Sequence, residues 1–155
     1  MALLGPRNEY ITDISWFMNE VAERGVCVSV STGGSGVALD QAESLATVKA
    51  SSSGVAPLGV LLNDVVNLDL TRQHLNQHKD EVQLGSKVTI LKVGEVVTNK
   101  VFGSPTAGAV AYCYASGLFA AASEDSSGAY TSPTVGRWMS TKDENGYAKL
   151  AVNLP

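Results

Sequence analysis

Short apolar stretches with a period of two residues recur along this chain, and they limit the possible folds more than any other feature. Val26, Val28 and Val30 alternate with small polar residues, and the glycine-rich run 33–36 follows directly. Because successive side chains of a strand point to opposite faces, this pattern predicts strands, and many short strands predict a small barrel or sandwich. We predict strands at 26–30, 37–40, 46–50, 58–62, 87–93, 95–101, 109–114, 118–121, 136–140 and 148–154.

Two segments depart from the strand pattern. Ile14, Phe17, Met18, Val21 and Ala22 have the spacing of one helix face, which predicts a short α-helix over residues 13–24. The polar stretch 63–81 predicts a long excursion from the sheet. The run 58–62 is continuously apolar and predicts a strand buried on both faces, and Gly94 predicts a turn between two strands.

The chain length of 155 residues is that of one domain. Residues 1–12 contain Leu3, Leu4, Tyr10 and Ile11, which are unusual in a solvated tail, and they predict an extended N-terminal arm that lies on another surface. The expected organisation is therefore an arm at 1–12 and one β-rich domain at 13–155.

Composition and charge exclude several classes of partner. The net charge is −4 and no Lys or Arg run occurs, so a nucleic-acid partner is not expected. No apolar stretch approaches the roughly 20 residues that cross a bilayer, so no membrane partner is expected either. Cys27 and Cys113 are expected to be small buried strand residues, with a disulfide left as the alternative.

The only concentrated candidate for chemistry is the pair His74 and His78. A spacing of four residues would place both rings on one helix face, and Asp80 or Glu81 could add a ligand. A metalloprotease motif would need Glu after the first His, where Leu75 stands. We therefore expect no enzyme, no catalytic residue, no cofactor and no resident metal. A small metal-dependent hydrolase remains a minor alternative.

Several segments resemble the head decoration (cement) proteins of tailed bacteriophages, especially those of marine podoviruses. They are Asp13-Ile-Ser-Trp-Phe-Met-Asn-Glu-Val-Ala-Glu-Arg-Gly25, Pro57-Leu-Gly-Val-Leu-Leu62, Arg72-Gln-His-Leu-Asn-Gln-His-Lys-Asp-Glu81, Val135-Gly-Arg-Trp-Met-Ser140 and Asp143-Glu-Asn-Gly-Tyr-Ala-Lys-Leu-Ala-Val152. The resemblance implies a small β-barrel or β-tulip-like domain on the outer surface of a virus capsid. It also implies that the protein stabilises the capsid, contacts the major capsid protein and forms dimers or trimers.

On this reading, the contact residues come from the arm, the predicted helix and the polar excursion. The expected capsid or subunit contacts are Leu3, Leu4, Arg7, Tyr10, Ile11, Trp16, Arg72, His74 and His78. The alternative is another virion component, such as a tail or fibre module that binds a glycan. That alternative would need an exposed aromatic or acidic sugar site, which the sequence does not reveal.

Overall fold

The computed structural model describes residues 2–5, 7–31, 44–48, 56–64, 81–123 and 132–155. Strands dominate these residues, and the one helical element is a single 3-10 turn, η1 (Ala115–Gly117). The strands are β1 (Asn8–Met18), β2 (Ala22–Glu23), β3 (Cys27–Val30), β4 (Ser44–Val48), β5 (Pro57–Asp64), β6 (Glu81–Val82), β7 (Lys87–Thr98), β8 (Val101–Phe102), β9 (Val110–Cys113), β10 (Phe119–Ala120), β11 (Thr134–Trp138) and β12 (Ala148–Asn153). The predicted mainly β fold is confirmed.

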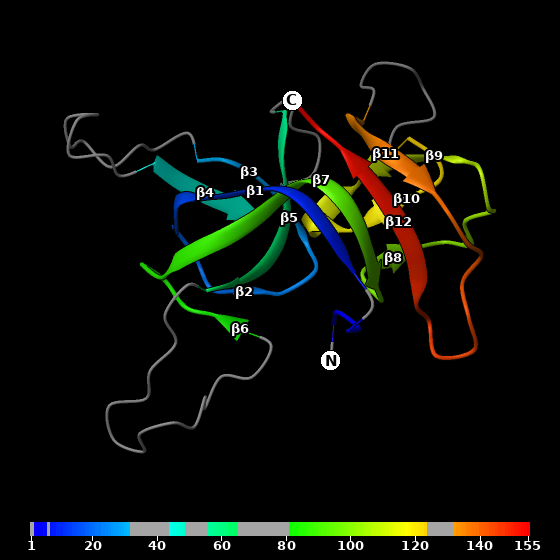
Figure 1. Ribbon diagram of the computed structural model, residues 1–155, viewed down its shortest axis with the longest axis horizontal. Helices are drawn as coiled ribbons and strands as arrows, with labels where there is room; N and C mark the ends of the chain where they lie inside the picture. Colours follow the sequence, from blue (N-terminus) through cyan, green and yellow to red (C-terminus); the bar gives the residue numbers. More distant parts are fainter. Residues whose placement is uncertain (1, 6, 32–43, 49–55, 65–80, 124–131) are drawn as a thin grey trace.

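Strand pairing closes part of the sheet into a ring. The order in the main sheet is β1-β4-β3-β5-β7-β12-β11-β9-β10-β8, and β1 pairs in addition with β7. That extra pairing joins β1, β4, β3, β5 and β7 into a five-stranded barrel. From β7 the sheet continues outward through β12, β11, β9, β10 and β8, which lie on the opposite side of β7 from β4 (Figure 1).

A first hydrophobic core, here called the barrel core, fills the ring. Every strand of the barrel contributes a buried side chain, and so does the two-stranded ribbon of β2 and β6, in which Ala22 pairs with Val82. The ribbon therefore packs against the barrel core from outside the ring. The buried members are Met18, Ala22, Val26, Val28, Ala46, Leu61, Val82, Val88 and Ile90.

A second core lies under the outward part of the sheet. It includes Trp138 and Phe119, the two largest fully buried side chains, and both cysteines, which are free thiols. The expectation that Cys27 and Cys113 are buried is confirmed. The other buried members are Leu3, Val60, Leu62, Leu91, Val96, Ala111, Val135, Ala148, Leu150, Val152 and Leu154.

Strand β5 separates the two cores. Val60 and Leu62 belong to the second core, whereas Leu61 between them belongs to the barrel core, and all three are fully buried. A strand buried on both faces has no polar side to alternate with. This explains the continuous apolar run and confirms the prediction for 58–62.

The helix predicted over 13–24 is wrong, because this segment contains the end of β1 and then β2. Ile14 and Val21, which the helical pattern placed on the buried face, are 52% exposed each. Register shifts in the β1–β7 pairing fall between Glu9 and Ile11, between Ile11 and Thr12, and between Asp13 and Trp16. Such bulges interrupt the two-residue alternation of a strand. The apolar residues of β1 therefore have a spacing that resembles that of a helix face.

The boundary predicted between an arm (1–12) and a domain (13–155) falls inside β1. Ala2 and Leu3 are buried, Leu3 forms a bridge with Thr98, and the N–H of Leu4 donates to the carbonyl of Val97 at 3.0 Å. The described N-terminal residues therefore continue along β7, where pairing with a strand from the middle of the chain holds them.

The turn predicted at Gly94 is also wrong, because β7 runs through it without a break. Gly94 lies opposite Glu9 of β1, and a Cβ added at Gly94 would lie 2.1 Å from the carbonyl oxygen of Asn8. Glycine inside a strand can mark a place where another backbone comes close, and that is its role here rather than a turn. Its φ of +155° is also unfavourable for other residues.

The remaining predicted strands that fall in the described residues are found with small shifts of their ends. In the predicted excursion 63–81, Asn63 and Asp64 end β5 and Glu81 begins β6. Residues 65–80, like the predicted strand 37–40, lie outside the described residues.

Replacing Gly94 with alanine should force β1 away from β7. Gly94→Ala is expected to lower the free energy of unfolding by about 3 kcal/mol, because it adds both an overpacked Cβ and backbone strain. Gly146→Ala is the matched control, because Gly146 also has a positive φ but has no atom within 4 Å of an added Cβ. It should cost only about 1 kcal/mol. Urea unfolding measures both values, and equal losses would contradict the role given to the close approach.

Candidate interaction surface

The structure separates the residues predicted as contacts into three groups. Leu3 is 4% exposed, in the second core, while Leu4 and Trp16 are half-buried. Arg7, just before β1, and Tyr10 and Ile11, near the start of β1, are exposed. The remaining three, Arg72, His74 and His78, lie outside the described residues.

Strand β1 exposes three large apolar side chains. Tyr10 is 72% exposed, Ile11 is 55% exposed and Ile14 is 52% exposed. We call these three residues the β1 surface. Sequence reasoning included Tyr10 and Ile11 but missed Ile14, because its spacing from Met18 was read as a buried helix face. The signal that could have found it is the richness of residues 10–17 in β-branched and aromatic residues, which favours a strand.

Within the described residues, part of the outer edge of β1 is unpaired beside this surface. One edge of β1 is paired with β7 from Asn8 to Phe17, whereas the other edge is paired with β4 only from Trp16 to Met18. Among the described strands, none pairs with the outer edge of β1 before Trp16. Unpaired N–H and C=O groups on such an edge, beside exposed apolar side chains, form a template for contact with another chain.

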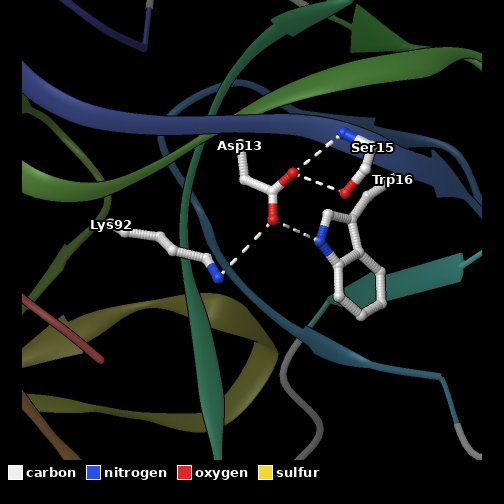
Figure 2. Close-up of polar contacts among 4 residues, drawn as sticks. All are labelled: Asp13, Ser15, Trp16 and Lys92. Carbon is white, nitrogen blue, oxygen red and sulfur yellow. Dashed lines mark hydrogen bonds and ion pairs between the residues drawn. The ribbon is translucent and has the colours of Figure 1, made fainter.

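A polar network centred on Asp13 holds the middle of β1 in place (Figure 2). One carboxylate oxygen of Asp13 accepts the backbone N–H of Ser15 at 2.9 Å and the Ser15 hydroxyl at 2.5 Å. The other accepts the indole N–H of Trp16 at 3.0 Å and lies 3.5 Å from Nζ of Lys92 on β7. These contacts fix Trp16, whose ring packs against the barrel core.

The network favours the ionised form of Asp13. Partial burial alone would raise the pKa of this carboxyl group. The hydrogen bonds from Ser15 and Trp16 and the positive charge of Lys92 outweigh that effect and lower the pKa from 3.8 to about 2. Asp13 is therefore a fixed negative charge at neutral pH, one residue before Ile14 of the β1 surface.

Charged groups near the start of β1 are paired with one another. Arg7 Nε lies 2.5 Å from Glu9 Oε1. Glu95 lies 2.7 Å from Lys149 Nζ and accepts a hydrogen bond from Asn8 at 3.2 Å. The hydrogen bond from Lys149 lowers the pKa of Glu95. An apolar patch with charged groups at its margin is the usual anatomy of a protein–protein interface.

The described residues contain no group of three or more His, Cys, Asp or Glu side chains placed to hold a metal ion. The minor alternative of a metal-dependent hydrolase rested on His74 and His78, which are outside these residues. In the same part of the chain, no helix has the length and apolarity needed to cross a bilayer.

Comparison with known protein families gives a match that covers most of the chain. Residues 11–153 match the family described as structural cement protein (E217 gp24/Pam3 gp6). The match runs from the β1 surface through β12 and so includes the barrel and the outward sheet. Among curated proteins, none matches the sequence significantly.

Asp13→Asn should make β1 less stable in a pH-dependent manner. A depressed pKa in the folded state stabilises the fold above about pH 4, and this contribution is lost as the pH falls from about 4 through about 2. We expect the variant to lose about 1 kcal/mol of unfolding free energy at pH 7, since the site is partly exposed, and almost none at pH 2.

Urea unfolding at both pH values checks this expectation. Glu144→Gln, at an exposed carboxylate in the loop before β12, is the control and should change the unfolding free energy by less than about 0.5 kcal/mol at either pH. A loss for Asp13→Asn that is the same at pH 7 and pH 2 would contradict the electrostatic explanation.

Proposed function

The chain belongs to the family of phage structural cement proteins, and from this premise we propose that it binds the outer surface of the capsid through the β1 surface. Membership makes it a structural virion protein that stabilises the capsid. Family membership alone leaves open which face of the shell is bound and which residues make the contact.

The observation that carries the proposal is the exposure of Tyr10, Ile11 and Ile14 on a strand with an open outer edge. Each of these side chains is already partly covered in the free chain, so burying its exposed part on docking would contribute about 1–2 kcal/mol. The edge adds backbone hydrogen-bonding groups for an extended segment of the major capsid protein. Arg7 and Glu9, next to this patch, would add specificity more than affinity.

We further propose that the protein acts as a dimer or trimer. A capsid presents many copies of the same site, and an oligomer that has bound through one subunit offers its next subunit at a high effective concentration. Closed symmetry matches the local symmetry axes of a shell. Each individual contact can then be modest. The role is purely mechanical, and no catalytic residue takes part in it.

The test is binding of purified variants to closed, DNA-filled heads that lack the cement protein, because such heads expose only their outer surface. The double variant Tyr10→Ser/Ile11→Ser should bind at least tenfold more weakly than the native chain, which corresponds to about 1.4 kcal/mol. Its fold should persist because both side chains are exposed. Truncation would be less informative, since removing residues 8–12 removes half of β1.

Val110→Ser/Met139→Ser is the matched control. These two apolar side chains are 42% and 48% exposed, and they lie in or next to β9 and β11 of the outward sheet. The control should occupy heads as fully as the native chain. Equal weakening by both double variants would argue against the β1 surface, and absence of native binding to closed heads would overturn the outer location.

A further inference from the structure

A small pocket lies beside β8 and β10, the last two strands in the order of the main sheet. It has a volume of about 210 Å³ and opens where the parallel strands β8 and β10 end side by side. In the sheet order β8 is the terminal strand, separated from β7 by β12, β11, β9 and β10 (Figure 1). Its lining residues are Phe102, Gly103, Ser104, Tyr114, Ala120, Ala121, Ala122 and Ser123.

Two stacked aromatic rings form one wall of the pocket. The rings of Phe102 and Tyr114 are 4.3 Å apart between centroids and within 10° of parallel. Phe102 is nevertheless 50% exposed, so the stack fixes the orientation of a ring that solvent still reaches. An immobilised aromatic face is a low-entropy platform for a ligand, and its negative π face attracts polarised C–H groups.

The rest of the wall consists of small side chains. The alanines at 120–122 leave space beside the rings, and Ser104 and Ser123 carry hydroxyl groups at the margin. The Ser123 hydroxyl oxygen accepts the N–H of Ser132 at 2.9 Å, which ties this wall to the start of the β11 segment. Lys142 Nζ donates to the carbonyl of Gly103 at 3.1 Å and fixes the loop after β8.

The described lining residues carry no charged side chain, which limits the chemistry of the ligand. An ionic group entering the pocket would lose hydration without a countercharge from these residues. Pockets for drug-sized molecules usually have volumes of about 300–1,000 Å³, so this one accepts only a smaller group. The ligand should therefore be small and neutral, with one face of C–H groups and a rim of hydroxyl groups.

We propose that this pocket binds a single neutral pyranose ring of a polysaccharide. The C–H face of the sugar lies against Phe102, and its hydroxyl groups bond to the serine hydroxyls and to backbone groups after β8 and β10. This function goes beyond capsid stabilisation and does not depend on it. A shell carrying many such pockets would bind a glycan surface by avidity even though each pocket binds weakly.

The experiment uses the full-length, isotope-labelled protein and the methyl glycosides of glucose, galactose and mannose as probes. At least one glycoside should produce saturable shifts of backbone amide resonances in residues 102–104, 114 and 120–123, with a Kd of about 1–10 mM. Phe102→Ala should weaken binding at least tenfold. Phe102→Tyr, which keeps the ring, should bind within about threefold of the native chain.

Met139→Ala serves as the control for loss of an exposed apolar side chain elsewhere, and it should leave glycoside binding unchanged. Unshifted resonances outside the pocket would show that Phe102→Ala is folded. The proposal is overturned if no glycoside gives saturable shifts, or if the shifts lie elsewhere. It is also overturned if a proline-rich peptide shifts the pocket resonances and the glycosides do not, since the site would then hold a protein segment. This experiment uses isolated protein without capsids. A negative result would therefore not bear on the proposed binding to the capsid.

Discussion

Strand β7 is hydrogen-bonded along both edges, and the rest of the structure depends on this double pairing. β1 covers one edge from Lys87 to Glu95, while β5 and then β12 share the other. The first half of β7 thereby closes the barrel, and the second half begins the outward sheet. Ile90 faces the barrel core and Leu91 the second core, so one strand supports both hydrophobic interiors.

The position of β1 follows from its place on β7. The N-terminal segment reaches its partner only because Gly94 lacks a side chain where the carbonyl of Asn8 approaches. Once β1 is paired with β7 and its end is paired with β4, Met18 is its one fully buried residue. Its apolar side chains at 10, 11 and 14 are then left in solvent, with Asp13 and Lys92 anchoring the strand behind them. The same pairing that completes the barrel therefore creates the surface proposed to meet the capsid.

The two proposed surfaces are formed by different strands. The β1 surface belongs to the barrel, whereas the aromatic pocket is formed at the ends of β8 and β10. The two sets of residues have no member in common. A structural protein with this arrangement can be held on a shell by one part while another part remains free to bind a ligand.

Local pattern was enough to predict the strands of the outward sheet, the two-sided burial of β5 and the buried cysteines, because alternation and apolar runs reflect the residues of one segment. The resemblance in residues such as Pro57-Leu-Gly-Val-Leu-Leu62 pointed to the family that the match over 11–153 then established. The helix at 13–24 and the turn at Gly94 were mistaken for one common reason. Each depends on pairing between residues as distant as Asn8 and Glu95, and bulges in that pairing imitate a helical period.

The sequence by itself therefore determined that this protein is a mainly β member of the cement family. Only the tertiary structure decided which apolar side chains remain exposed, because a strand's hydrogen-bonding partners lie far away in the chain and no local period records them.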